Sequence, residues 1–504
     1  MSSTRRMAWS LVLLASSLWG CERGPTTSAD DPVPGPTMSV VSPTLSCASA
    51  LAGSRRAGTL SFVHVADLHA SYNPGDDGVS PYAFLAGYVA ARRALNPATV
   101  FTDGGDDLEK GSLAELASRG AATRAIVHAM GFDVRTLGNH DFAWSAAETL
   151  AFARDPSATV VTSNVRYLGP EGAFQTVPST VRNVGCWRVG FFGLIPEPYG
   201  ADGRQQDDDY YPDFPTDNDT TEAARRIVDE LRPRVDVLVL VSHLGLSADR
   251  ALAHALPGID VILGGHSHST TPTPEQVGST LIVHPGAHGK TVALLDLHLD
   301  PARGTLVGTD FALSPIDAGL AEPDSAVQAV VEAQLATWAP DALQAVGRLE
   351  RPRKRFEIAE ISARAAVAVL GVDAALVDRD LVDQPWNDLT VRRQALADTW
   401  TGMRAPPGSP GIDALYSAEV SGADLRALWS YADERWHVVV PFPLDEHATY
   451  TLALPKRAVA DPSAGLPVVT TLVAPRLLCE AWELLDEWAL RQRETAAAFD
   501  AELP

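Results

Sequence analysis

Between Thr59 and about Ile316, short apolar runs alternate with alanine-rich stretches of helical length. This alternation is typical of an α/β domain, in which each helix returns the chain to begin a new strand. The pattern predicts strands over Leu60–Val65, Thr99–Thr102, Val134–Leu137, Thr159–Ser163, Trp187–Leu194, Val235–Val241, Val261–Leu263, Leu281–His284 and Val292–Leu299. It predicts helices over Tyr82–Leu95, Leu113–Met130, Ser145–Ala153, Thr221–Arg232 and Ser247–Leu256.

The 504 residues exceed what one compact core usually holds, so we expect two domains. The first spans 59–322, a single helix over 323–340 connects the two, and a smaller α/β domain spans 341–504. In the smaller domain the pattern predicts helices at Ile358–Leu370, Val391–Trp400 and Ala423–Ala432, and strands at Ala374–Val377 and Thr449–Leu454.

The N-terminal segment has the form of an export signal. Arg5 and Arg6 precede the apolar stretch Met7–Trp19, which is too short to anchor stably across a bilayer. The sequence up to Cys21 resembles a bacterial lipobox, apart from Trp19. We therefore expect a signal peptide over 1–21 with lipidation of Cys21; the alternative is an ordinary cleaved signal with an incidental cysteine.

Residues 22–58 are rich in Pro, Ser, Thr and Gly, which predicts a flexible tether. The mature chain is then an exported lipoprotein held to a membrane through its lipid. Glu22 favours the outer membrane, and the periplasmic and cell-surface faces both stay open. Export permits disulfides; a Cys47–Cys186 bridge with Cys479 left over and three unpaired cysteines are both compatible with the sequence.

The formal net charge of −23 argues against nucleic-acid binding. An acidic surface also repels phosphate esters, so a phosphate site would need local positive charge. Metal ions would supply it.

Polar segments follow five of the predicted strands, in one chain order. They are Asp67-Leu68-His69, Gly105-Asp106, Gly138-Asn139-His140-Asp141, Ser242-His243 and Gly265-His266-Ser267-His268. Open α/β sheets bind ligands at the carboxyl ends of their strands, and residues two apart on a strand share a face. The set supplies enough oxygen and imidazole donors for two adjacent transition-metal ions, which usually means hydrolysis at phosphorus.

Each segment alone has a simpler interpretation. His243, at the end of the most apolar strand, could be a satisfied core histidine. Because the other four segments carry further metal-binding side chains, we favour the interpretation of His243 as a metal ligand.

These segments resemble the signature of the metallophosphoesterase superfamily, D-x-H, G-D, G-N-H-D/E, H and G-H-x-H, most closely in its 5′-nucleotidase branch. The resemblance implies a four-layer αββα sandwich followed by a smaller C-terminal domain. It implies one ion held by Asp67, His69, Asp106 and His268. It implies a second ion held by Asp106, Asn139, His243 and His266, with Asp106 bridging. Zn, Mn, Fe and Co all suit such ligands, and sequence does not choose among them.

In the family the histidine after the asparagine, here His140, stabilises charge or protonates the leaving group. An orienting Asp commonly lies three residues later, where this chain has Ala143. Asp141 is the candidate substitute, so His140 and Asp141 are the predicted catalytic pair. We expect reduced activity on poor leaving groups.

The second domain departs further from the family. Asp378-Arg379-Asp380-Leu381-Val382 replaces the nucleoside-binding N-x-G-G-x-R stretch, and no aromatic pair that would clamp a base can be assigned. Trp386, Tyr416 and Trp436 are candidates, although core or surface packing is the favoured interpretation of each. The default substrate is a 5′-nucleotide, with cyclic nucleotides, sugar nucleotides or other esters as alternatives. A catalytically weak surface binding protein is the alternative of another class. The oligomeric state is not indicated.

Overall fold

The computed structural model describes residues 58–495 apart from 110, 197–212, 218, 301–304, 380–381, 383–384, 400–413, 432–435, 441–442, 456–457 and 459–472. The predicted signal peptide with Cys21, the tether and Cys47 lie outside the described residues. Cys186 lies half-buried in a turn, and its pairing with Cys47 stays a prediction. No helix in the described ranges is both long and apolar enough to cross a membrane.

Two six-stranded sheets form the first domain. The first sheet has the order β12 (Leu306–Pro315), β11 (Thr291–Leu299), β1 (Thr59–Val65), β2 (Thr99–Asp103), β3 (Val134–Arg135) and β4 (Thr159–Val160). Strands β1 to β4 pair in parallel, so their carboxyl ends meet at one edge.

The second sheet has the order β5 (Ser179–Val184), β6 (Trp187–Leu194), β7 (Val237–Ser242), β8 (Val261–Gly264), β10 (Thr280–Val283) and β9 (Glu275–Val277). Here β6, β7, β8 and β10 pair in parallel. The sequence pattern did not predict β5, β9 or β12, whose residues are mostly half-exposed and lack a strong apolar run.

The two sheets pack face to face over an apolar core. Leu60 and Phe62 of β1 point into it, and the ring of Phe62 meets that of Phe191 edge to face with centroids 6.3 Å apart. Val63 and Val65, on the opposite face of the same strand, join a different cluster under helices. One strand thus contributes to two layers, as the pleat requires.

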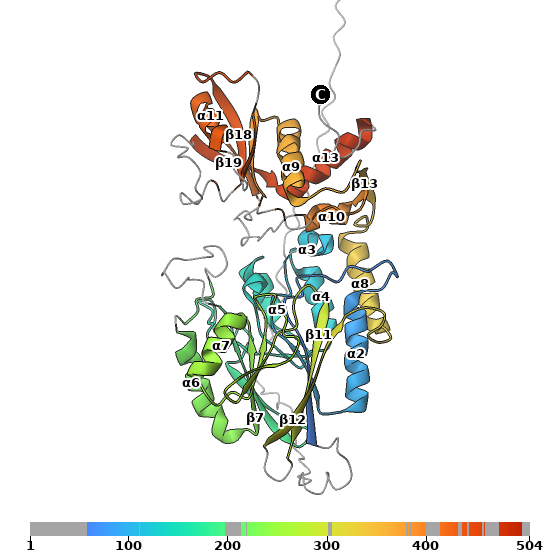
Figure 1. The fold of residues 1–504 in the computed structure, drawn as a ribbon, viewed down its shortest axis with the longest axis vertical. Coiled ribbons are helices and arrows are strands. Elements are labelled where there is room, and N and C mark those ends of the chain that lie inside the picture. The colour runs from blue at the N-terminus through green and yellow to red at the C-terminus, as the bar shows by residue number, and fades with distance from the viewer. Residues whose placement is uncertain are drawn as a thin grey trace, which may run out of the picture. The chain divides into compact units, whose positions relative to one another are not determined.

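Helices cover the outer face of each sheet. On the first sheet these are α2 (Pro81–Leu95), α3 (Leu113–Ser118), α4 (Ala121–Ala129), α5 (Ala146–Ala153) and α8 (Ser325–Trp338). On the second they are α6 (Thr220–Leu231) and α7 (Leu246–Ala255). Figure 1 shows α6 and α7 on one side of the paired sheets and α2 and α8 on the other. The predicted four-layer αββα sandwich is confirmed.

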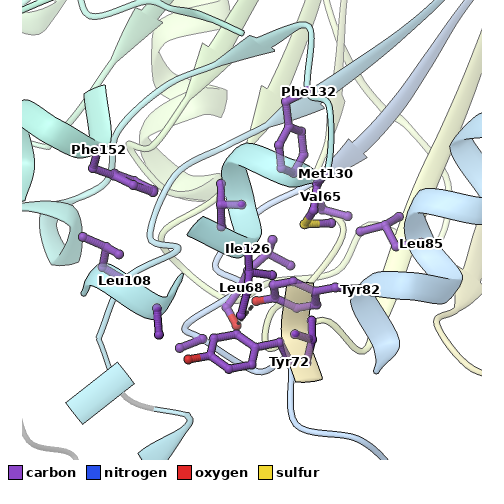
Figure 2. Close-up of a cluster of buried hydrophobic side chains, with 14 of the residues drawn as sticks. Val65, Leu68, Tyr72, Tyr82, Leu85, Leu108, Ile126, Met130, Phe132 and Phe152 are labelled. Carbon is purple, nitrogen blue, oxygen red and sulfur yellow. Dashed lines mark hydrogen bonds between the residues drawn. The ribbon is translucent and has the colours of Figure 1, made fainter. Parts of the chain in front are cut away.

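The helix layer over the first sheet has its own buried cluster. Figure 2 shows part of it, including Tyr82 and Leu85 of α2 and Ile126 of α4. The hydroxyl of Tyr82 donates to the carbonyl of Leu68, which lies in the loop after β1 (3.2 Å). The cluster therefore anchors the first polar segment as well as the helices.

The helix predicted over Leu113–Met130 is two helices, α3 and α4. Arg119 and Gly120 between them both have left-handed backbones, with φ of 53° and 94°. A left-handed residue ends an α-helix, and glycine takes that conformation at little cost. The alanine-rich composition concealed this break.

The C-terminal part has a five-stranded sheet and two buried clusters of its own. Its strand order is β17 (Trp436–Val439), β14 (Ala374–Asp378), β18 (Thr449–Pro455), β16 (Ala414–Ser421) and β19 (Val473–Glu480). Its helices are α9 (Arg355–Leu370), α10 (Arg393–Asp398), α11 (Gly422–Tyr431) and α13 (Ala481–Thr495), and β13 (Ala345–Arg348) pairs with β15 (Thr390–Arg392). The predicted connecting helix is α8, which packs against α2, α3 and α4.

Candidate metal centre

The predicted polar segments lie in the loops that follow β1, β2, β3, β7 and β8. Five of the seven predicted ligands hold left-handed backbones there: Asp67, His69, Asp106, His266 and His268. That conformation is unfavourable for residues with a Cβ, and such strain concentrates at functional sites. The surrounding fold thus holds these side chains where local preference alone would not place them.

Asp67, His69 and His268 form one donor group, with one ligand atom from each within 4.8 Å of the others. The Nε2 atoms of His69 and His268 are 3.1 Å apart, and Nε2 of His268 is 3.7 Å from Oδ1 of Asp67. The side chain of His69 is fully buried, whereas that of His268 is 40% exposed. The group is therefore closed on the protein side and open toward solvent.

Asp106, His243 and His266 form a second donor group within the same limit. Nε2 of His243 lies 2.9 Å from Oδ2 of Asp106. Its Nδ1 lies 2.6 Å from the carbonyl oxygen of Gly104 and must donate to it. A backbone bond of this kind keeps the proton on Nδ1 and directs Nε2 into the site, where it can bind a metal once its own proton is displaced.

Asp106 connects the two groups. Its Oδ2 is 3.9 Å from Nε2 of His69 and 2.9 Å from Nε2 of His243. Its Oδ1 accepts the backbone N–H of His140 at 2.7 Å. The carboxylate thus faces donors of both groups, which is the placement expected of a bridging ligand.

Asn139 supplies an independent test of whether a cation fits. Its side-chain carbonyl oxygen is buried and has no hydrogen-bond partner among the described residues. An orphaned buried acceptor is costly, and a bound cation would satisfy it. The residue opens a short 3₁₀ helix, η2 (Asn139–Phe142), beside Asp106. The donors present therefore fit divalent ions.

The electrostatics of the site agree with this. Burial raises the pKa of Asp67 to about 8 and lowers the pKa of His266 to about 4. Burial would also raise the pKa of Asp106, but the imidazoles of His243 and His140 outweigh it and hold that pKa well below its usual value. Burial would lower the pKa of His243, yet Asp106 raises it to about 10. In the metal-free site, bound protons partly offset the negative charge of the buried carboxylates. A bound cation would displace these protons.

Two glycines allow the loops to approach each other. A Cβ on Gly138 would lie 2.1 Å from Oδ1 of Asp106, and one on Gly105 would lie 2.4 Å from the backbone nitrogen of Gly138. Gly105 also has a left-handed φ of 84°. Any side chain at these positions would separate the loops after β2 and β3.

The carboxylate beside the His140 ring is one that the sequence analysis did not single out. Nδ1 of His140 lies 2.5 Å from Oε2 of Glu109, a fully buried side chain in the loop after β2. Ala143 is buried among apolar residues and needs no polar role. Sequence reasoning missed Glu109 because its partner is 31 residues away and no spacing rule connects the two.

Asp141, the substitute predicted for the missing carboxylate, does something else. Its two oxygens accept the backbone N–H groups of Asp106, Asp107, Leu108 and Gly138 at 2.8–3.1 Å. It therefore ties together the loops after β2 and β3. No hydrogen bond joins Asp141 to the His140 ring among the described residues, and the carboxylate beside that ring is Glu109.

A further imidazole borders the first donor group. The ring of His288 lies 5.2 Å from that of His69 and 5.1 Å from that of His268, and its backbone N–H donates to the carbonyl of Asp67 (2.7 Å). His288 was not among the ligands expected from the sequence.

In the C-terminal part the structure describes the side chains of two of the three candidate aromatics, and both pack in the interior. Trp386 is 5% exposed, and its Nε1 donates to Oγ1 of Thr399 at 2.8 Å, so it belongs to the core. Tyr416 packs against a buried cluster. The side chain of Trp436 lies outside the described residues. Asp378, in place of the family's nucleoside-binding stretch, is fully buried.

Comparison with known proteins agrees with the geometry. The calcineurin-like phosphoesterase family profile matches residues 60–270, which contain all seven predicted ligands. Among curated proteins, the chain is 24% identical over 299 residues to the trifunctional nucleotide phosphoesterase protein YfkN of Bacillus subtilis, covering 49% of this chain and 20% of that protein. It is 25% identical over 234 residues to the 5′-nucleotidase of Mus musculus, covering 42% of this chain and 38% of that protein. The chain thus spans less than half the length of these two relatives.

Solved structures resemble a larger part of the chain. A 5′-nucleotidase precursor from Thermus thermophilus superposes with a TM-score of 0.64 at 20% identity, covering 86% of this chain and 96% of that one. A 5′-nucleotidase from Candida albicans gives a TM-score of 0.64 at 13% identity, covering 86% and 98%. At these identities the likeness establishes the fold of both parts of the chain.

Proposed function

Since residues 60–270 form a calcineurin-like phosphoesterase domain, we propose that the protein is a hydrolase of phosphate esters that uses two divalent transition-metal ions. The observation that carries the proposal is that Asp106 belongs to two donor groups, one with His69 and His140 and one with His243 and His266. The orphaned oxygen of Asn139 lies beside them. A protein retained only as a binding scaffold has no need to keep this complete ligand set.

Asp67, His69, Asp106 and His268 would hold one ion, and Asp106, Asn139, His243 and His266 the other. When bound, such ions stabilise negative charge on phosphoryl oxygens and make water nucleophilic at neutral pH. The donors suit Zn, Mn, Fe or Co.

The chain's own contribution to the chemistry falls to His140. Hydrolysis forms a bond from a water oxygen to phosphorus and breaks the bond to the leaving oxygen, which takes up a proton. The His140 side chain is 10% exposed, and its Nε2 lies 4.0 Å from Oδ2 of Asp106, at the site. Nε2 can therefore donate to the leaving oxygen or stabilise its charge.

A 5′-nucleotide is the default substrate of the proposal. It is supported by similarity to proteins named as 5′-nucleotidases and nucleotide phosphoesterases. The burial of Trp386 leaves the base without an assigned aromatic clamp. Cyclic nucleotides, sugar nucleotides and other esters are therefore the competing substrates.

The deciding experiment measures metal content and turnover together. The purified protein is loaded separately with Mn, Zn and Co and screened against 5′-nucleotides, cyclic nucleotides, sugar nucleotides and simple phosphate esters. We expect close to two ions per chain and hydrolysis of at least one class. A chain that binds no metal, or binds two ions and hydrolyses no ester, would overturn the proposal.

The cellular location of the protein is a separate part of the proposal. The lipobox-like sequence ending in Cys21 supports export with a lipid anchor. Expression in bacteria with radiolabelled palmitate tests this: we expect label in the wild-type chain and none in Cys21→Ser. Equal labelling of both, or of neither, would refute lipidation at Cys21.

A further inference from the structure

We propose that Glu109 is the positioning residue of the active site: through one hydrogen bond it holds the His140 ring in the orientation needed to act on the leaving group. This inference rests on the proposed hydrolysis for its kinetic consequence, but its structural basis is independent of it. Glu109 lies outside the polar segments predicted from the sequence.

The hydrogen bond has the geometry of an orienting contact. Oε2 of Glu109 and Nδ1 of His140 are 2.5 Å apart, and the Glu109 side chain is fully buried. A carboxylate can only accept, so Nδ1 must carry the proton. Nε2 then points toward Asp106, at 4.0 Å from its Oδ2, where a leaving oxygen would be protonated.

Glu109 is itself held in place. Its backbone N–H donates to Oε1 of Glu115 at 2.8 Å, and the same oxygen accepts Nε1 of Trp144 at 2.5 Å. Its own backbone is left-handed, with φ of 64°. An unfavourable conformation fixed by buried contacts is expected where the direction of one side chain matters.

The His140 backbone is fixed by the same loop. Its N–H donates to Oδ1 of Asp106, three residues before Glu109. The loop after β2 therefore fixes both the backbone of His140, through Asp106, and its ring, through Glu109. His140 therefore makes two hydrogen bonds to this short segment, one from its backbone and one from its ring. The ring cannot turn without breaking the bond to Glu109.

The contact also serves a charge function. To donate from Nε2 while Nδ1 keeps its proton, the imidazole must first be doubly protonated, and a buried carboxylate on Nδ1 stabilises that cation. The ring becomes neutral as the Nε2 proton passes to the leaving oxygen. Removing the carboxylate should therefore affect esters whose leaving oxygen needs a proton. Esters with stable leaving anions depend on it less.

The test compares Glu109→Gln and Glu109→Ala with the wild type on a 5′-nucleotide or another alkyl phosphate and on p-nitrophenyl phosphate. On the alkyl ester we expect kcat to fall by about tenfold or more, with Ala worse than Gln, while KM and metal content stay near the wild-type values. On p-nitrophenyl phosphate the loss should be several-fold smaller. Glu148→Gln is the matched control, because Glu148 pairs with Arg124 at 2.6 Å and plays no part in the site.

A readout without turnover separates this inference from the proposed function. In proton NMR of the metal-free protein, we expect a downfield Nδ1 proton that assigns to His140 and disappears in Glu109→Ala. If that signal is found but no ester is hydrolysed, the proposed function fails and the positioning contact stands. Equal losses on both leaving groups, a loss of metal, or a rise in alkyl-ester turnover in Ala143→Asp would overturn the role of Glu109.

Discussion

The guanidinium of Arg135 lies 2.6 Å from the carboxylate of Asp107, and neither side chain reaches solvent. The same guanidinium lies 3.0 Å from Asp103 and 3.1 Å from Asp155, and it stacks over the ring of Phe152 at 4.3 Å. Asp103 ends β2 and Asp107 follows Asp106. Arg135 thus neutralises buried acids on both sides of the proposed bridging ligand.

Replacing Arg135 should be costly. Arg135→Met leaves Asp103 and Asp107 buried without their cation, which typically destabilises a protein by about 3–5 kcal/mol. We expect a large drop in the free energy of unfolding in urea, together with weaker metal binding. Arg234→Met is the control, because that residue's pair with Glu230 is exposed and should contribute little. Similar unfolding curves for both variants would contradict this account.

Gly138→Ala should disable the centre through crowding. The added Cβ would lie 2.1 Å from Oδ1 of Asp106, a contact that requires the two loops to separate. We expect at least tenfold weaker metal binding, measured by calorimetry, and a lower melting temperature. Gly308→Ala is the matched control, since its Cβ would meet only a His298 ring atom at 3.6 Å. Unchanged metal affinity in Gly138→Ala would contradict this prediction, because it would show that the two loops can separate without disturbing the ligands.

Two ligand variants test whether Asp106 is a ligand of both metal ions. Asp106→Asn removes charge from both groups, so we expect loss of both ions. His243→Ala affects one group, so we expect about one ion per chain to remain. Metal content of the dialysed proteins distinguishes these outcomes. If hydrolysis is unchanged in both variants, the assignment of the centre is wrong.

His64 should make the fold sensitive to acid. It is fully buried, between Oγ1 of Thr102 (3.0 Å) and the carbonyl of Gly264 (3.3 Å), and burial lowers its pKa to about 3. The unfolded chain takes up this proton at the ordinary pKa of about 6.5, before the folded chain does. Stability from neutral His64 is therefore complete above pH 6.5 and is lost as the pH falls toward 3.

The measurement for His64 is the free energy of unfolding at several pH values. We expect the wild type to lose up to about 1.4 kcal/mol per pH unit more than His64→Gln between about pH 6 and pH 4. Glutamine can still bond both neighbours but does not titrate. Parallel pH profiles for the two proteins would show that His64 does not contribute.

The convergence of the expected ligands could be predicted from the sequence because each follows a strand, and parallel strands bring their carboxyl ends to one edge. The predicted bounds of β1, β6 and β11 were within a residue of those observed, since buried strands are continuous apolar runs. In the first domain three strands were missed because their exposed or half-exposed residues show no such run, as in β5. Several strands of the C-terminal part, such as β16, were not predicted either.

What could not be predicted depends on contacts across the chain. Glu109 and His140 come from loops after different strands, and nothing in either loop indicates the other. Asp141 was assigned to the wrong partner because it is adjacent to His140 in sequence, whereas its carboxylate faces the backbone of the preceding loop. The environment of the C-terminal aromatics could not be predicted from the sequence either, and the structure places Trp386 in the core.

The contact between Glu109 and His140 has a consequence for how such chains are classified. The family pattern supplies the orienting carboxylate from the turn that bears the histidine, and here the neighbouring loop supplies it. A motif search confined to the position of Ala143 would place this chain among inactive homologues. Two alternative acceptors for one hydrogen bond also give evolution a neutral route: a chain carrying both carboxylates can lose either, and its descendants then differ in motif while keeping the same chemistry.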